Sequence, residues 1–206
     1  MARKARISRK TKETDITVEL NLDGRGAHDV LTPIPFFSHM LSALAKHALF
    51  DLKLRAKGDV DVDFHHTVED AGICLGEAFK KAIGDKKGIC RIGEASVPMM
   101  DSMSTAVLDI SGRPYFRFNS GKGASTVAKR IFAGVKTESV FDFGLVEEFM
   151  FAFANNAGID LHLTLNYGKD IHHSIESAFK ALGRALKEAS RKDARIKGVL
   201  STKGKL

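Results

Sequence analysis

The strongest constraint on the fold is an internal repeat, because the chain contains the sequence His-His-x-x-Glu twice. The two copies begin at His65 and at His172, 107 residues apart. Over the eighteen positions that start at these histidines, nine residues are identical between the copies, far more than chance supplies. A repeat of this length indicates two copies of one structural unit that bury their apolar faces together.

The similarity continues upstream of both motifs. With a slip of two residues, positions 43–54 correspond to 152–163, and a weaker match relates 17–25 to 105–113. The order of the matching segments is the same in both halves. We therefore predict a single domain over 1–206, made of two repeats (about 1–92 and 93–193) and a basic C-terminal tail.

Each repeat predicts the same series of elements. Apolar and polar residues alternate before a glycine, as in a strand that runs into a turn, and a helical segment, a second strand and a second helix follow. The predicted strands are 16–22 and 52–56 in one half and 106–110 and 161–165 in the other; the predicted first helices are about 36–47 and 145–155. The second helix of each half opens at its His-His motif, and Gly84-Asp85 closes the first copy. This order favours an α+β fold, an internally duplicated sandwich in which each half is a mixed sheet backed by two helices on one face. A pseudo-twofold axis would relate the halves.

Composition narrows the classes of protein. No apolar run approaches the ~20 residues that span a bilayer. The basic residues at 1–12 have no apolar stretch behind them, so they are not expected to act as a secretory signal. The two cysteines form no disulfide framework, and a cytoplasmic setting is expected. The net charge of +7 is concentrated at the ends, because residues 1–12 and 191–206 together carry +11. This distribution is unlike a basic nucleic-acid groove. Both ends are predicted to be solvated tails, with phosphate binding by the C-terminal one as the alternative.

The doubled motif predicts metal binding. On a helix, a histidine and a glutamate three or four residues apart are neighbours, whereas adjacent histidines point roughly 100° apart. The two histidines of a pair are therefore suited to different ions, and two pairs predict a two-metal site. Imidazole and carboxylate without thiolate suit Mn²⁺, Fe²⁺, Zn²⁺ or Ni²⁺, and an open octahedral site suits Mn²⁺ best. His39 and Glu148 align across the repeats as further candidates; for His47, spacing leaves a site role and a surface role open.

Further segments carry a family pattern over almost the whole chain: Thr11-x-Glu13-Thr14, Phe36-Phe37-Ser38-His39-Met40-Leu41, Asp63-Phe64-His65-His66-Thr67-Val68-Glu69-Asp70, Gly88-Ile89-Cys90-Arg91-Ile92-Gly93, Asp109-Ile110-Ser111-Gly112-Arg113-Pro114, 172–181 and Ser201-Thr202-Lys203-Gly204. In these segments the chain resembles the imidazoleglycerol-phosphate dehydratases, the hydro-lyases of histidine biosynthesis. Two positions depart from the usual pattern: Ser38 stands where Asp is common, and Met100-Asp101 stands where Asp-Glu is usual.

The resemblance implies two Mn²⁺ ions per active site, with Fe²⁺ or Zn²⁺ as alternatives. The implied metal ligands are His39, His65, His66, Glu69, Glu148, His172, His173 and Glu176. The implied contacts to a small phosphorylated imidazole substrate are Glu13, His47, Arg91, Arg113, Lys169, Ser201 and Lys203, with Glu13 and His47 also catalytic. The resemblance further implies a homo-oligomer of 24 subunits with cubic symmetry and active sites at subunit interfaces, with no nucleic-acid or membrane partner.

The implied reaction converts D-erythro-imidazole glycerol phosphate to imidazole acetol phosphate and water. The carbon-bound hydrogen is not acidic, so a route through the ring is expected. A ring bound by metal at both nitrogens becomes an imidazolate that expels the hydroxyl and leaves a diazafulvene-like intermediate, which would explain a doubled ligand module. Glu13 is the candidate acid or base, with a metal-bound water as the alternative, and forked guanidinium groups suit the phosphate.

Two other classes remain open from the residues alone. Paired metals also serve phosphoester hydrolases, although such sites are usually rich in Asp. A basic RNA-binding module would use the charged ends and would bind with strong salt dependence, but it leaves the doubled motif unexplained.

Overall fold

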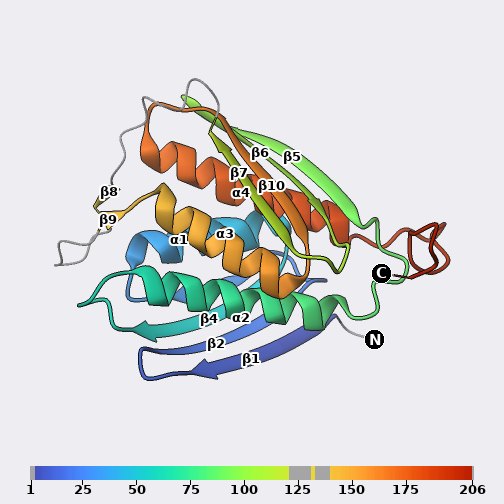
Figure 1. Ribbon diagram of the computed structural model, residues 1–206, viewed down its shortest axis with the longest axis horizontal. Helices are drawn as coiled ribbons and strands as arrows, with labels where there is room; N and C mark the ends of the chain where they lie inside the picture. Colours follow the sequence, from blue (N-terminus) through green and yellow to red (C-terminus); the bar gives the residue numbers. More distant parts are fainter. Residues whose placement is uncertain (1–2, 121–130, 133–139, 206) are drawn as a thin grey trace.

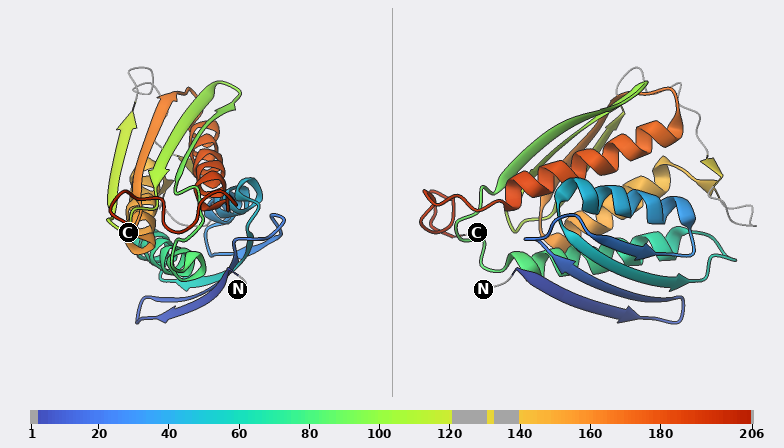
Figure 2. Two further views of the ribbon diagram at one scale, coloured as in Figure 1. Left: turned by 90° about the vertical axis from the view of Figure 1, so that its right-hand side faces the viewer. Right: turned by 180° about the vertical axis from the view of Figure 1, so that it is seen from behind.

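Two sheets form the outside of the molecule and the helices lie between them (Figures 1 and 2). The structure is a computed structural model that describes residues 3–120, 131–132 and 140–205. In the first half the elements are β1 (Lys4–Lys10), β2 (Thr14–Asn21), β3 (His28–Leu31), α1 (Pro35–Ala48), β4 (Asp51–Gly58) and α2 (His65–Ile83). In the second half they are β5 (Ile92–Met99), β6 (Ser102–Asp109), β7 (Tyr115–Ser120), α3 (Phe143–Ala157), β10 (Asp160–Tyr167) and α4 (Ile171–Ser190), with a short β8 (Ile131–Phe132) and β9 (Val140–Phe141) pair before α3.

The two sheets have the same topology. Their strand orders are β1-β2-β4-β3 and β5-β6-β10-β7. In each, the last strand pairs in parallel with its neighbour while the other pairs are antiparallel. The predicted duplicated α+β sandwich of mixed sheets, each backed by two helices, is therefore confirmed.

The halves meet through their helices, because α2 packs on α3 and α1 packs on α4. Equivalent glycines allow the helices to approach closely. A Cβ on Gly76 would lie 2.7 Å from the carbonyl oxygen of Phe153, and a Cβ on Gly183 would lie 2.6 Å from that of Leu44. Phenylalanines also meet across this interface, with Phe37 of α1 edge-on to Phe149 of α3 at a centroid distance of 5.5 Å and Phe79 of α2 edge-on to Phe153 of α3 at 6.0 Å. A common core thus joins the halves into one unit.

The predicted elements lie where expected, but the prediction for the N-terminal segment was wrong. Residues 4–10 are strand β1, paired along its length with β2, and not a solvated tail. The physical reason is a period-two pattern within the segment. Ala5 and Ile7 pack against the core, while the alternate residues Lys4, Arg6 and Ser8 face solvent. The total charge of the segment had obscured this alternation.

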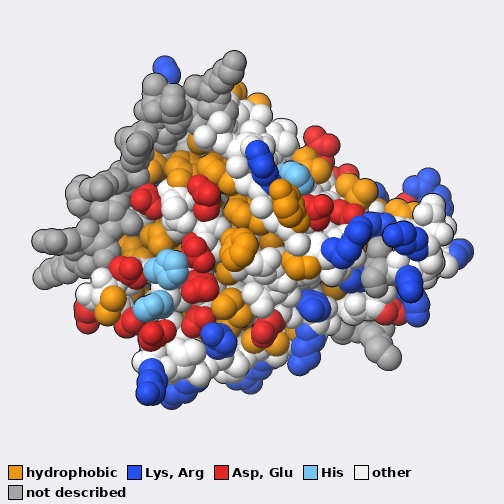
Figure 3. Space-filling view, viewed as in Figure 1, with side chains coloured by type: hydrophobic (Ala, Val, Ile, Leu, Met, Phe, Trp, Pro, Cys, Tyr) orange, Lys and Arg blue, Asp and Glu red, His pale blue; other side chains and the backbone are white. Residues whose placement is uncertain are grey.

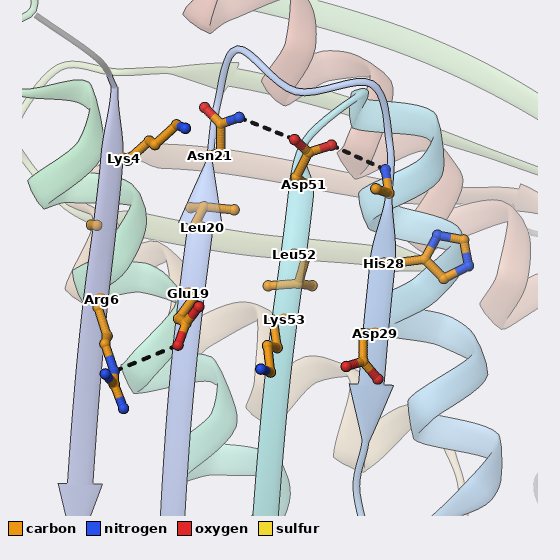
Figure 4. Close-up of a pocket in the computed structure, with 12 residues that line it drawn as sticks. Lys4, Arg6, Glu19, Leu20, Asn21, His28, Asp29, Asp51, Leu52 and Lys53 are labelled. Atoms are coloured by element: carbon orange, nitrogen blue, oxygen red, sulfur yellow. Dashed lines mark hydrogen bonds and ion pairs between the residues drawn. The ribbon is translucent and has the colours of Figure 1, made fainter.

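The outer face of the first sheet has a broad, shallow depression of about 720 Å³ (Figure 4). Its floor carries opposite charges on neighbouring strands, in the row Arg6, Glu19, Lys53 and Asp29. Arg6 lies 3.6 Å from Glu19 across the strands. Opposite charges on neighbouring strands attract one another across the sheet. Neither Glu13 nor His47 lines the depression. Among the described helices, none is long and apolar enough to cross a membrane.

Candidate metal centre

A first cluster of potential ligands lies where α1 meets α4. His39 of α1 and His172 and Glu176 of α4 each offer one donor atom, and these atoms all lie within 4.8 Å of one another. The Nε2 atoms of His39 and His172 are 3.7 and 3.3 Å from Glu176 Oε2. The imidazoles are about half exposed whereas the carboxylate is 9% exposed, so the cluster opens at the surface.

A second cluster lies at the equivalent place where α2 meets α3. It consists of His65 and Glu69 of α2 and Glu148 of α3, again with donor atoms within 4.8 Å. His65 Nε2 is 3.6 Å from Glu69 Oε2. Glu148 takes the position that His39 takes in the first cluster, as the slipped alignment of the repeats predicted. Histidine and acidic side chains gather here in Figure 3, over the first turns of α2.

The second histidine of each motif faces elsewhere. The rings of His65 and His66 lie at 85° to each other, and those of His172 and His173 at 71°. His66 Nδ1 is 3.0 Å from Asp59 Oδ2, and His173 Nδ1 is 3.0 Å from Asp101 Oδ1. The bond to Asp59 raises the pKa of His66 above its ordinary value, and the bond from His173 lowers the pKa of Asp101. Adjacent histidines therefore do not share a cluster within one chain.

The two clusters fit a divalent ion. Each combines imidazole and carboxylate donors without thiolate, which suits Mn²⁺, Fe²⁺ or Zn²⁺. Around an octahedrally coordinated ion with bonds of about 2.1 Å, neighbouring donor atoms are about 3 Å apart. The histidine–glutamate spacings of 3.3, 3.6 and 3.7 Å, in clusters whose donor atoms all lie within 4.8 Å, would contract on binding such an ion. Three donors per cluster leave the remaining positions for groups from outside the cluster.

Lys180 is a partner of the first cluster that sequence reasoning missed. Its Nζ lies 2.7 Å from Glu176 Oε1, and both side chains are largely buried. Burial alone would raise the pKa of Glu176, but the bond and charge of Lys180 and the imidazoles of His39 and His172 outweigh it and lower that pKa. The spacing of four residues on one helix could have revealed this pair.

His47 lies two turns after His39 on α1 and is partly buried. Burial lowers its pKa, and the positive charges of Lys180 and Arg184 lower it further. The structure thus places His47 beside α4, close to the Glu176 cluster. Glu13 instead lies exposed in the turn between β1 and β2, where it shares an open groove with Asp59 and its charge acts on His66.

The residues predicted to bind phosphate lie apart from the clusters. Arg91 is held by Asp109 through two bonds of 2.6 and 2.7 Å and donates to the carbonyl oxygen of Leu200. Its backbone N–H bonds to Ala189 O at the end of α4. Because α4 rises about 1.5 Å per residue, Ala189 lies about 25 Å from His172.

The elements show the same separation. Both α2 and α4 begin at the left of Figure 1 and end at the right, near the C-terminus, where lysines and arginines gather in Figure 3. Ser201 and Lys203 belong to this end, with Arg113 close by, because Ile110 N–H bonds to Arg91 O. Lys169 is exposed and lies at the other end, between β10 and α4. One chain therefore brings the clusters and most of the phosphate candidates to opposite ends.

Comparisons with known proteins fit this architecture. The structure of imidazoleglycerol-phosphate dehydratase from Staphylococcus aureus superposes with a TM-score of 0.78, 33% identity and coverage of 92% of this chain and 99% of that one. The structure of IGPD from Pyrococcus furiosus in complex with (S)-C348 superposes with a TM-score of 0.79 and 34% identity, and the match covers 97% of this chain and 100% of that one. The fold, the duplicated site and these relatives define the class: the protein is an enzyme of the hydro-lyase type, not a phosphoester hydrolase.

Sequence comparisons give the family. The model for imidazoleglycerol-phosphate dehydratase matches residues 32–186. Imidazoleglycerol-phosphate dehydratase of Pelobacter propionicus is 50% identical over the full length of both chains, and that of Clostridium botulinum is 53% identical over 98% of this chain and 97% of its own. The chain belongs to the imidazoleglycerol-phosphate dehydratase family.

Proposed function

We propose that this chain dehydrates imidazole glycerol phosphate to imidazole acetol phosphate in histidine biosynthesis, with two Mn²⁺ ions at each active site. The observation that carries the proposal is the pair of equivalent clusters, His39/His172/Glu176 and His65/Glu69/Glu148. The substrate ring has two nitrogens, and two like sites can bind it from both sides. When bound, the ions would act as Lewis acids that draw charge from the ring and ease the loss of its N–H proton.

The remaining chemistry is assigned to side chains of the protein. Glu13 is the candidate for moving the proton at the carbon beside the departing hydroxyl, because its carboxylate is exposed at a turn tip. The pKa of His47 is lowered by burial and by Lys180 and Arg184, which favours its neutral form, and a neutral imidazole can form hydrogen bonds with a substrate hydroxyl. Arg113, Ser201 and Lys203 would bind the phosphate, while Arg91 would orient it from the Asp109 pair.

The separation of the metal-ligand clusters from most of the phosphate candidates within one chain supports an active site shared between subunits. The distance of about 25 Å from His172 to the region of Arg91 is far longer than a ring with a three-carbon phosphate chain. His66 and His173 also lie outside the clusters of their own neighbours. A second chain that supplies these histidines and a basic end would complete the half-open clusters, in line with the proposed 24-subunit cubic assembly.

The test is a dehydration assay with the purified protein, Mn²⁺ and imidazole glycerol phosphate, with detection of the enolisable ketone product. We expect product only with metal present. His66→Ala and His173→Ala should each lose tightly bound metal and activity, whereas Lys203→Ala should mainly raise the KM for substrate. Absence of product from the metal-loaded protein would disprove the proposed reaction.

A further inference from the structure

The second histidine of each motif is held by an aspartate. His66 and His173 each place Nδ1 at 3.0 Å from a carboxylate oxygen. An ionised carboxylate only accepts hydrogen bonds, so Nδ1 carries the proton and Nε2 keeps its lone pair. This tautomer is the one in which Nε2 can bind a metal ion, and a carboxylate behind a histidine is a common way to fix it.

The two aspartates come from different parts of the repeat. Asp59 follows β4, on the chain that leads into α2, whereas Asp101 lies in the turn between β5 and β6. The duplication therefore preserved the histidine–carboxylate contact but not its origin. The closest alternative partner of His173, Asp170, lies at 3.8 Å, too far for a hydrogen bond.

Strand register identifies the first-half counterpart of Asp101. In the second hairpin Met99 pairs with Ser102, which leaves a two-residue turn that ends at Asp101. In the first hairpin the N–H of Thr11 bonds to Thr14 O, which leaves a two-residue turn that ends at Glu13. Glu13 and Asp101 are thus equivalent carboxylates at the tips of equivalent hairpins.

The loops that lead into α2 and α4 differ between the halves, and this difference explains why Glu13 and Asp101 have different contacts. Gly58 packs against Thr67 and Gly168 packs against Ser174 in the same way, so these glycines mark the same point in both halves. From that point, residues 59–64 precede His65, but only 169–171 precede His172. The first loop is three residues longer, and it begins with Asp59 where the second loop begins with Lys169.

We infer that Asp59 and Asp101 are positioning residues that fix the metal-binding tautomer of His66 and His173. In the first half Asp59, and not the hairpin carboxylate Glu13, makes this contact with the histidine, which leaves Glu13 available to the substrate. This inference rests on the proposed function, which gives Glu13 and the histidines their roles. Glu13 makes no side-chain hydrogen bond to any residue that the structure describes. Glu13 and Asp59 line one open groove, so the two carboxylates are neighbours with divided tasks.

The direct test uses the metal-free full-length chain labelled with ¹⁵N-histidine. Two-bond ¹H–¹⁵N correlation spectra, recorded well above the pKa of histidine, distinguish the two tautomers. We expect Nδ1–H at His66 and His173 in the wild type. Asp59→Ala should shift only His66 toward Nε2–H, and Asp101→Ala should shift only His173. Asp59→Asn, which keeps an accepting oxygen, should preserve the tautomer of His66.

Metal affinity gives a second readout that does not depend on turnover. Equilibrium dialysis against Mn²⁺ should show affinity reduced about 10- to 100-fold in Asp59→Ala and Asp101→Ala. Glu13→Gln should leave both the tautomer of His66 and the Mn²⁺ affinity unchanged, although Glu13 is the counterpart of Asp101. Asp61→Ala, an exposed carboxylate in the same loop as Asp59, is the matched control and should also bind Mn²⁺ normally.

Two results would overturn the inference. Unchanged tautomers in Asp59→Ala and Asp101→Ala would show that the aspartates do not position the rings. A change in the tautomer of His66 in Glu13→Gln would show that the hairpin carboxylate Glu13 also positions this ring. Because the tautomers are measured without metal or substrate, they can be established even if the proposed dehydration proves wrong.

Discussion

At the scale of single residues, the second oxygen of Glu176 shows how a largely buried carboxylate is kept ionised before metal binds. One oxygen faces His39 and His172, and the other bonds to Lys180 at 2.7 Å. The equivalent Glu69 is more exposed, at 40%, and the helix position that matches Lys180 is Ile73. The two clusters therefore differ in charge and solvation despite equivalent geometry.

Replacing Lys180 should expose this difference. In Lys180→Met the Glu176 carboxylate loses its partner, and the free energy of unfolding of the metal-free protein should fall by about 2–3 kcal/mol, below the range for fully buried pairs because some exposure remains. Added Mn²⁺ should recover part of the loss, since the ion restores positive charge beside Glu176. Denaturant unfolding with and without Mn²⁺ measures both effects. Lys187→Met, an exposed change on the same helix, is the control; equal losses in the two variants would contradict this account.

Some of the site could be predicted from single residues and some could not. The repeated His-His-x-x-Glu predicts two clusters because spacing along a helix fixes which side chains are neighbours. The pairing of Asp101 with His173 could not be predicted, because it joins a hairpin turn to a helix 72 residues away. Such contacts depend on how the layers pack, which local periodicity does not encode.

At the scale of elements, the helix crossings depend on the absence of a side chain at two equivalent places. Gly76 brings α2 onto α3, and Gly183 brings α4 onto α1. Each crossing carries one cluster of candidate metal ligands near the N-terminal ends of its helices. The distance between the two helices of each pair therefore affects the geometry of the cluster that they carry.

A methyl group at either crossing should be costly. Gly183→Ala places Cβ 2.6 Å from the carbonyl oxygen of Leu44, so the helices must move apart, at about 1–3 kcal/mol; Gly76→Ala should behave alike. The midpoint temperature of thermal unfolding and the affinity for Mn²⁺ should both fall. Gly144→Ala is the milder comparison, because its Cβ would meet no backbone atom and only the side chain of the N-cap residue Asp142, at 3.1 Å, so it should destabilise the protein less. A wild-type unfolding profile for Gly183→Ala would disprove the close approach.

The ends of α1 and α3 offer another comparison between the halves. Both end in a left-handed residue, which is Gly158 after α3 (φ 67°) and Leu49 after α1 (φ 56°). A branched side chain in this conformation is strained by about 1–2 kcal/mol, and Leu49 is 41% exposed, so little packing would be lost on its removal.

Leu49→Gly should therefore stabilise the protein, by about 0.5–1 kcal/mol after the lost contacts are counted. The reverse change, Gly158→Leu, should destabilise it. Equilibrium denaturation of both variants gives the comparison, and a loss of stability in Leu49→Gly would mean that the contacts of Leu49 outweigh its strain.

Sequence periodicity predicted the four helices well because each has a clear apolar face toward the core. It did not predict β1, since six basic residues in twelve suggested solvation. The pairing of β1 with β2 stabilises that segment through a ladder of hydrogen bonds, and ladder formation depends on a partner strand.

At the scale of the whole molecule, the helices define a direction. Their N-terminal ends carry both clusters, and the opposite end carries Arg91 and the C-terminal segment, linked by the bond from Arg91 to Leu200 O. The helices lie between the two sheets, which cover the outside of the molecule (Figure 2). The candidate metal ligands and most of the candidate phosphate-binding residues are thus separated by the length of a helix.

This separation has a genetic consequence. If one site draws its two ends from different chains, His172→Ala and Arg113→Ala should each inactivate the protein, yet the two defective copies should complement each other when expressed together. In mixed assemblies, up to about a quarter of the end-to-end pairings would combine two intact ends. Growth without histidine, or activity of the co-purified mixture, reports the rescue. As a control, co-expression of His172→Ala with His65→Ala, two mutations in the same end, should give far less rescue. A mixture of His172→Ala and Arg113→Ala that is no more active than either variant alone would indicate that each chain works alone.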